Sequence, residues 1–342
     1  MYDVASRWPP ARAFHYRIAG RLFSVELPDS ETIHPLDGYF SVMRASRVEG
    51  VAGVPAARLI LQRGSRDLLG LGSSFVYDDT GGEAVCYSSR NLYEVRIKNS
   101  TVRAGRDRTV VVSMAEDLDP RSFLFERVFA HGLAAALRRA GAFELHCAAV
   151  IDPKTSRSAL IVGPSGSGKS TLALQLAAKG WNFSSDDVVL LTASGEKIEA
   201  FGLRKHFALT SATIAKSGVP GLASALMIKT IGVDNKLALV PENIFPAQHL
   251  HTCVPEFLIF AQRTDAGESQ LAPITQADAM KRLLRISQAS CLDEPTAGTL
   301  LKILSRLARQ GRAFDLLSGT DLLGNLQYTA GFLGSIFSRK AA

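Results

Sequence analysis

Cysteine is scarce in this sequence of 342 residues. The four cysteines lie far apart, and no two of them form the C-x-x-C pair that is common in zinc and redox sites. Isolated cysteines in a chain of this length favour reduced thiols and argue against a disulfide framework. We therefore expect a cytoplasmic protein whose cysteines are free, namely Cys86, Cys147, Cys253 and Cys291.

Long apolar runs are also missing. None approaches the roughly 18 consecutive apolar residues that a membrane-spanning helix requires. The first residues lack the charged and then apolar profile of a signal peptide. The sequence therefore predicts a soluble protein without a membrane partner.

Basic residues are in excess but are not clustered. The chain has 39 Lys and Arg residues against 32 Asp and Glu residues, which gives a formal net charge of +7. These residues are scattered, and no DNA- or RNA-binding motif accompanies them. We expect no nucleic-acid partner, since a mildly basic surface also suits phosphates or an acidic peptide.

The chain divides into two regions of different pattern. Residues 1–120 alternate apolar and polar positions, which predicts a β-rich N-terminal module whose role the sequence leaves open. Residues 121–335 mix helical and strand-like periods, which predicts an α/β domain. The expected strands are 15–25 (two strands around a glycine turn), 58–62, 84–87, 93–97, 109–113, 144–151, 158–162, 188–191 and 256–261; the expected helices are 123–137, 171–179, 277–284 and 297–307.

A glycine-rich motif lies between a predicted strand and a predicted helix. Residues 163–170 (GPSGSGKS) fit the P-loop pattern G-x-x-x-x-G-K-[ST] at every fixed position. Glycines let backbone N–H groups turn toward an anion, and the helix N-terminus adds about half a positive charge. A simple tight turn is the alternative, but the flanking elements favour a nucleotide-phosphate site. Its expected residues are Gly163, Ser165, Gly166, Ser167, Gly168, Lys169, Ser170 and Thr171.

Two adjacent acids follow this motif. Asp186 comes 17 residues after Lys169 (186 − 169), about the length of one helix and one turn, so the chain returns beside the phosphate end. Lys169 would reach the β- and γ-phosphates, and the hydroxyl of Ser170 would contact Mg²⁺. The two acids are Asp186 and Asp187. Because neighbouring residues of a strand point in different directions, the two carboxylates need not do the same job. One can hold Mg²⁺, and the other can accept a proton from an incoming hydroxyl. A solvated turn is the alternative interpretation.

A single histidine completes the candidate site. His146 lies on the predicted strand 144–151, two elements before the glycine-rich motif. A histidine among small apolar residues is usually a core residue. From this strand it could also approach Asp186 and tune the proton affinity of that carboxyl group.

The sequence resembles the HPr kinase/phosphorylase family in three features taken together. These are His146 on its predicted strand, residues 163–170, and the acidic pair that follows Lys179-Gly180. The resemblance covers about residues 143–191 and continues weakly to about residue 330. It implies the fold of phosphoenolpyruvate carboxykinase-like P-loop kinases, with ATP as donor, Mg²⁺ as metal and a protein serine as acceptor.

The resemblance also implies a role for each site residue. Lys169 would bind the phosphates and Ser170 the metal. Asp186 would be the base, which doubles as the acid in the reverse reaction. Asp187 would lie near the metal, and His146 would support Asp186.

The sequence departs from that family at several points. Thr171 stands where the family usually has glutamate, residues 228–233 lack the arginine expected of a later loop, and the N-terminal module is not the family's own. The chain looks more like HPr-kinase-related proteins, some of which modify lasso-peptide precursors. We therefore predict an Mg-ATP-dependent kinase that acts on a serine of a peptide or small protein; a homo-oligomer is left open. The alternatives are a small-molecule kinase of the same fold and a nucleotide-binding regulatory module without turnover.

Other motifs favour weaker interpretations. Residues 292–298 (LDEPTAG) resemble the Walker B region of ABC ATPases, but the four residues before them are not an apolar strand, so Asp293 or Thr296 is expected to cap a helix. Residues 234–236 have the letters of a guanine-reading motif in the wrong order. Residues 204–206 are a candidate cationic clamp or a solvated basic loop, and Arg263 is a weaker candidate of the same kind.

Overall fold

The computed structural model describes residues 12–28, 33–50, 53–64, 73–79, 82–222, 225, 227–229 and 236–338, and it separates into two compact units. The first unit comprises Met1–Ala142 and Leu292–Gly298, and the second comprises Phe143–Cys291 and Thr299–Ala342. The molecule is of mixed α/β type with two large sheets. No helix among these described residues is long and apolar enough to cross a bilayer.

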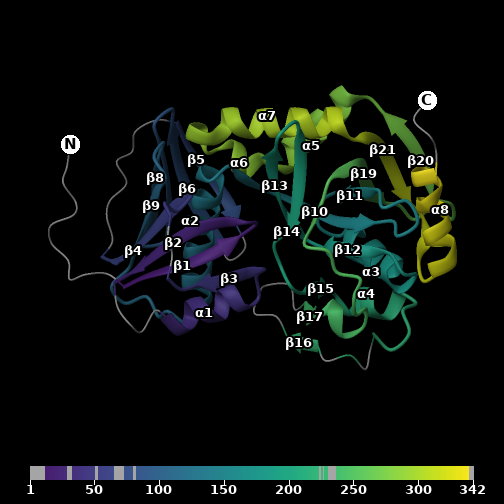
Figure 1. Cartoon of the computed structure of the whole chain (residues 1–342), viewed down its shortest axis with the longest axis horizontal. Coiled ribbons are helices and arrows are strands. Elements are labelled where there is room, and N and C mark those ends of the chain that lie inside the picture. The colour runs from purple at the N-terminus through teal and green to yellow at the C-terminus, as the bar shows by residue number, and fades with distance from the viewer. Residues whose placement is uncertain are drawn as a thin grey trace. The chain divides into compact units, whose positions relative to one another are not determined.

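The first unit is built on a nine-stranded sheet (Figure 1). Its strands pair antiparallel except at β2–β4 and β4–β9, which are parallel. The predicted hairpin at 15–25 and the strands at 58–62, 84–87, 93–97 and 109–113 are confirmed. In spatial order the strands are β3 (Ala45–Val48), β1 (Arg12–Ile18), β2 (Arg21–Leu27), β4 (Ala57–Arg63), β9 (Thr109–Met114), β8 (Ser100–Gly105), β7 (Leu92–Ile97), β6 (Gly82–Ser89) and β5 (Ser73–Asp79), and a helix, α1 (Ile33–Ser41), follows β2.

Helix α2 (Phe123–Arg139) packs on this sheet against β4, β8 and β9. It begins after Ser122, whose hydroxyl accepts a hydrogen bond from the Phe125 N–H at 3.1 Å. Gly132 lets the helix come close to the sheet, because a Cβ at this position would lie 2.5 Å from Cγ2 of Val112. The domain boundary that the sequence predicts between residues 120 and 121 falls just before α2. A division into two domains at this boundary stays a prediction.

A buried ionic cluster joins Leu292–Gly298 to the rest of the first unit. Asp293 is fully buried, and its carboxylate accepts hydrogen bonds from Arg138 and Arg139, with Arg139 binding both oxygens at 2.7 and 3.1 Å. The other N–H groups of Arg139 reach the backbone carbonyls of Ala104, Gly105 and Ala135, so its five donors are all used. Asp293 does precede a helix, as expected, but its side chain binds arginines.

We expect Asp293→Asn to destabilise the protein by about 3–5 kcal/mol, since it leaves two buried guanidinium groups without their anion. The free energy of unfolding in urea measures the effect. Asp117→Asn, at an exposed position of the same unit, is the matched control and should change stability by less than about 0.5 kcal/mol. Equal stability losses in the two variants would contradict the ionic role of Asp293.

The second unit also contains a nine-stranded sheet, together with a three-stranded one. The predicted helices and strands of this region are confirmed, with ends shifted by a few residues. The large sheet has the order β18 (Thr252–Cys253), β14 (Lys197–Gly202), β13 (Val188–Ser194), β10 (Ala142–Ile151), β11 (Ser158–Val162), β19 (Pro255–Arg263), β21 (Arg312–Ser318) and β20 (Gln270–Ile274), with β12 (Asn182–Ser185) paired to β10; the small sheet has the order β15 (Phe207–Leu209), β17 (Leu237–Leu239) and β16 (Met227–Lys229). The helices are α3 (Lys169–Ala178), α4 (Ser211–Lys216), α5 (Gln276–Ile286), α6 (Gln288–Cys291), α7 (Glu294–Gln310) and α8 (Leu326–Ser338), with 3₁₀ turns at Pro241–Asn243 and Thr320–Leu322.

The centre of the large sheet of the second unit, at β11, is buried on both faces. Ala159 and Ile161 of β11 share a core with α3 and α8, whereas Leu160 and Val162 share a core with α5 and α7. A strand covered on both faces favours apolar residues at successive positions, which explains the apolar run 159–162 in β11. β11, β19 and β21 are parallel neighbours, so their carboxyl ends meet at one edge of the sheet.

Candidate functional site

The glycine-rich loop, residues 163–168, connects β11 to α3 at that edge. Gly166 and Gly168 have φ values of 81° and 94°, in the left-handed region that other residues avoid. Gly163 has no room for a side chain, because a Cβ there would lie 2.5 Å from the Ala261 carbonyl oxygen. The loop therefore depends on glycine at three positions, and Gly168 caps the N-terminus of α3.

Lys169, the first residue of α3, folds back on this loop. Its Nζ donates hydrogen bonds to the carbonyl oxygens of Gly163 at 2.8 Å and Pro164 at 2.9 Å. Burial lowers the pKa of this amine, while the nearby Asp187 carboxylate opposes the shift. Ser167 is also buried, and its hydroxyl oxygen has no hydrogen-bond partner. A buried hydroxyl without a partner is unusual in a folded protein, and here it belongs to the loop itself.

Asp186 lies inside the protein. It follows β12 in the bend before β13, and only 1% of the residue is exposed. Its Oδ2 accepts a hydrogen bond from the Ala208 N–H at 3.2 Å, and its Oδ1 has no partner. The hydroxyl of Ser170 lies 3.4 Å from the Asp186 carbonyl oxygen. Burial, with a further contribution from Asp187, raises the pKa of Asp186 to about 7.

Asp187 points to a different environment. Its Oδ1 lies 3.1 Å from Nδ1 of His146, and its Oδ2 lies 3.2 Å from Nη1 of Arg204. The hydroxyl of Ser185 accepts hydrogen bonds from the N–H groups of Asp187 and Val188, each at 3.2 Å, and so fixes the bend. The two adjacent carboxylates therefore diverge, as their adjacency predicts: Asp186 faces the small sheet, and Asp187 faces a cavity.

His146, on β10, contacts Asp187 and not Asp186, the partner expected from the sequence. The side chain is 41% exposed. Burial lowers its pKa, and the cations Lys169 and Arg204 add to the decrease while Asp187 opposes it. A neutral imidazole at pH 7 would donate its Nδ1–H to Asp187, which leaves Nε2 as an acceptor.

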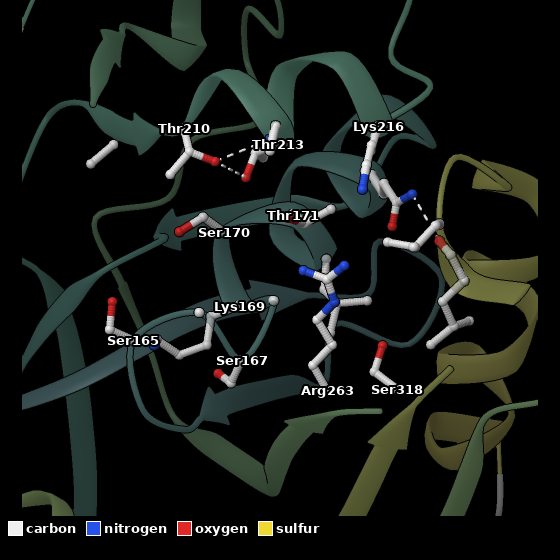
Figure 2. A pocket seen from close by; sticks show the side chains of 18 of the residues that line it. Ser165, Ser167, Lys169, Ser170, Thr171, Thr210, Thr213, Lys216, Arg263 and Ser318 are labelled. Carbon is white, nitrogen blue, oxygen red and sulfur yellow. Dashed lines mark hydrogen bonds between the residues drawn. The ribbon is translucent and has the colours of Figure 1, made fainter. Parts of the chain in front are cut away.

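The loop, His146 and Asp187 line a single cavity of about 430 Å³. Figure 2 shows Lys169, Ser165 and Ser167 on one side and Arg263 and Ser318 on the other. Among its described lining residues, Asp187 is the one carboxylate, and the cations are Lys169, Lys216, Lys236 and Arg263. Such a lining is suited to an anionic ligand.

The cavity collects most of the predicted site residues and adds others. Ser165, Gly166, Ser167, Gly168, Lys169, Ser170 and Thr171 line it, whereas Gly163 supports the loop from behind and Asp186 lies outside the lining. Arg204 contacts Asp187, and Arg263 lines the cavity. No sequence motif marks the further lining residues, because separate segments of the chain contribute them: Gln175, Thr210, Thr213, Lys216 and Ser318. Residues 230–235 lie outside the described part of the chain.

No family model matches the sequence, and no curated protein matches it. One solved structure with a detectable likeness is the HPr(Ser) kinase/phosphatase from Coxiella burnetii. The two sequences are 17% identical, the match covers 36% of this chain and 59% of that chain, and the TM-score is 0.23. The matched part is thus less than two thirds of that protein. A likeness at this level identifies neither the activity nor the site residues of this chain.

The raised pKa of Asp186 predicts how stability depends on pH. The folded-state pKa of about 7 exceeds the ordinary value of 3.8, so the folded protein keeps a proton that the unfolded chain releases. The contribution of this group to stability is complete below about pH 4 and is lost as the pH rises through 7. Asp186→Asn carries a neutral side chain at every pH, and we expect its stability relative to the wild type to increase between about pH 4 and 7 and to level off above that. Urea unfolding at several pH values measures the difference; a difference independent of pH would contradict the assignment.

Proposed function

We propose that the second unit is a kinase that binds Mg-ATP in this cavity and transfers the terminal phosphate to a serine hydroxyl of a peptide or small protein. One observation supports the proposal: two features with different chemical roles line the same cavity. A glycine-rich loop with a buried lysine lies beside a carboxylate–imidazole pair. The first feature suits phosphate binding, and the second suits proton transfer.

The loop offers several donors to phosphate oxygens. Its backbone N–H groups and the N-terminus of α3 favour an anion. Lys169 now donates to two backbone carbonyls, and on binding it would exchange them for phosphate oxygens. The Ser167 hydroxyl has no other partner and is free to donate.

The residues near Ser170 fit a magnesium ion. Ser170 lines the cavity, and its hydroxyl, which lies 3.4 Å from the Asp186 carbonyl oxygen, would offer one protein ligand to the ion. No group of three or more His, Cys, Asp or Glu side chains among the described residues is arranged to hold a metal. Mg²⁺ needs no such group, since it is commonly bound by one or two protein oxygens together with phosphates and water. When bound, it would neutralise charge on the phosphates.

The geometry favours His146 and Asp187 as the proton-accepting pair. The family resemblance implies Asp186 as the base, but Asp186 is 1% exposed and does not line the cavity. His146 and Asp187 both do. In the proposed step the acceptor oxygen bonds to the γ-phosphorus, the bond from that phosphorus to the bridging oxygen breaks, and ADP leaves. The hydroxyl proton passes to Nε2 of His146, while Asp187 orients the ring through Nδ1.

The acceptor side of the cavity is positively charged. Arg204 and Lys236 act electrostatically on His146 together with Lys169. Such a surface attracts an acceptor that carries negative charge near its hydroxyl group. An acidic segment around the target serine would meet this requirement, and an anionic small molecule is the other acceptor class to be compared with it.

We expect Lys169→Met to weaken ATP binding by about 10- to 100-fold, since it removes charge-assisted hydrogen bonds to phosphate oxygens. Isothermal titration calorimetry measures the affinity. Lys179→Met removes an exposed lysine at the opposite end of the same helix and should leave the affinity unchanged. Equal affinities in the two variants would remove the phosphate site from the proposal.

We expect Asp187→Asn and His146→Gln each to slow phosphate transfer by about 10²- to 10⁴-fold while ATP binding is retained. Transfer of labelled phosphate to serine-containing acidic peptides, followed by mass spectrometry, provides the measurement. Asp186→Asn, at a residue outside the cavity lining, should slow transfer much less than either of these variants. If Asp186→Asn abolishes transfer at saturating Mg²⁺ and Asp187→Asn remains active, the base is Asp186. If the wild type binds ATP but neither transfers nor hydrolyses its phosphate, the unit is a nucleotide-binding module.

A further inference from the structure

Two cations line the cavity beside Thr171. Lys216 is the last residue of α4, and Arg263 is the last residue of β19. Figure 2 shows their side-chain nitrogen atoms directed toward the region of Thr171, the third residue of α3. Cations that converge next to a glycine-rich loop are suited to the phosphate chain of a ligand, because charged groups make the strongest hydrogen bonds to phosphate oxygens.

The two cations are held in different ways. Arg263 belongs to the parallel ladder of the large sheet, where it pairs with Ser318 of β21. Lys216 is exposed, and its helix α4 has six residues, none of them buried. Thr210 caps the N-terminus of α4, but a helix of this length is unstable by itself. The position of the Lys216 ammonium group therefore depends on how the C-terminal end of α4 is held.

Gln175 of α3 holds that end. The residue is fully buried, and its Nε2 donates hydrogen bonds to the carbonyl oxygens of Ser217 at 3.1 Å and of Leu322 at 2.9 Å. Ser217 is itself fully buried and directly follows Lys216. Because both amide N–H groups are used, the orientation of the amide is fixed. One side chain of α3 thus binds the backbone beside Lys216 and the turn that follows β21.

The two segments that Gln175 binds also touch each other. A Cβ at Gly218 would lie 2.5 Å from the Gly324 carbonyl oxygen, so no side chain fits at this crossing. The φ values of Gly218 and Gly324 are 70° and 71°, in the left-handed region that favours glycine. The crossing therefore fixes residues 216–218 against residues 322–324, and Gln175 joins both to α3.

Helix α3 connects this arrangement to the phosphate site. Gln175 lies four residues after Thr171 and six residues after Lys169 on the same helix. Residues four apart lie on one face of a helix, and both Thr171 and Gln175 line the cavity. Oε1 of Gln175 has no hydrogen-bond partner, and its partial negative charge weakens the repulsion between the cations of the lining.

We propose that Lys216 is a second phosphate-binding lysine of this cavity and that Gln175 is the residue that positions it. In a glycine-rich loop of this pattern Lys169 contacts the β- and γ-phosphates, and Lys216 adds a cation on the Thr171 side of the same phosphate chain. Gln175 acts through the Ser217 carbonyl group and does not contact the phosphates. The assignment rests on the proposed function, because it takes the phosphate chain of ATP as the ligand.

Calorimetry with ATP and with inorganic tripolyphosphate tests the role of Lys216. Because this lysine binds phosphate and not the nucleoside, Lys216→Met should weaken both ligands by the same factor, about tenfold. Lys302→Met removes an exposed lysine of α7 outside the cavity lining and should leave both affinities unchanged. If Lys216→Met binds both ligands as tightly as the wild type, or loses affinity for ATP alone, the inference is wrong.

A double-mutant cycle with tripolyphosphate tests whether Gln175 acts through Lys216. Gln175→Met preserves the length of the side chain but removes both donors, and it should weaken binding about fivefold. In the Lys216→Met background the same change should have no further effect, because the cation that Gln175 positions is gone. In the Arg263→Met background it should keep its full effect, because the sheet holds Arg263. Equal further losses in the two backgrounds would overturn the positioning role.

Gly218→Ala repeats the cycle from the exposed side of the crossing. It disturbs the contact with Gly324 and leaves the buried amide in place, so it should weaken tripolyphosphate binding in the wild-type background and not in the Lys216→Met background. A loss of affinity that is the same in both backgrounds contradicts the inference. This variant decides the question even if Gln175→Met fails to fold.

Steady-state kinetics separate positioning from a general loss of structure. Lys216 binds phosphate oxygens before and during transfer, so Gln175→Met should raise the KM for ATP about fivefold and change kcat by less than about threefold. A partly unfolded enzyme would instead show a lower kcat at an unchanged KM, and that result would contradict the positioning role. If the wild type binds neither ATP nor tripolyphosphate, the proposed function fails together with this inference. If the wild type and Lys216→Met bind both equally well while Lys169→Met does not, the proposed function stands and this inference alone fails.

Discussion

The whole site depends on the parallel pairing of β11 with β19 and of β19 with β21. Val162, the last residue of β11, pairs with Phe260, and the ladder continues to Arg263 and Ser318 at the ends of the next two strands. Apolar cores on both faces hold β11 in this register, because a shift by one residue would exchange the side chains of its two faces. The register also brings Gly163 against the Ala261 carbonyl, where no side chain fits.

Local features of the site could be predicted from the sequence, and long-range partners could not. The strand, glycine-rich loop and helix are specified within about twenty residues, because left-handed glycines and a lysine at a helix start are local requirements. The partner of His146 is set by the β10–β12 pairing, whose register shifts between Ala149 and Val150, and by the bend at Ser185. Neither is visible as a motif. The same holds for Gln175, whose partners are supplied by distant segments.

Asp293 in the first unit also has partners that could not be predicted from the local sequence. The sequence around Asp293 predicts the start of a helix, and α7 does begin at Glu294. Its carboxylate, however, binds two arginines that lie more than 150 residues earlier in the chain. A local sequence pattern can identify a cap position. It cannot show that buried arginines from a distant part of the chain bind the same carboxylate, because that pairing is set by the fold.

The distribution of charge explains how a cavity of this composition is stable before it binds a ligand. The described lining residues include four cations against one carboxylate, and the cations would repel one another if all faced inward. Lys169 instead donates to two backbone carbonyls, and Asp186 is buried with a pKa of about 7 beside Asp187. In the proposed function, an incoming polyphosphate would give the lysine better acceptors than these carbonyls.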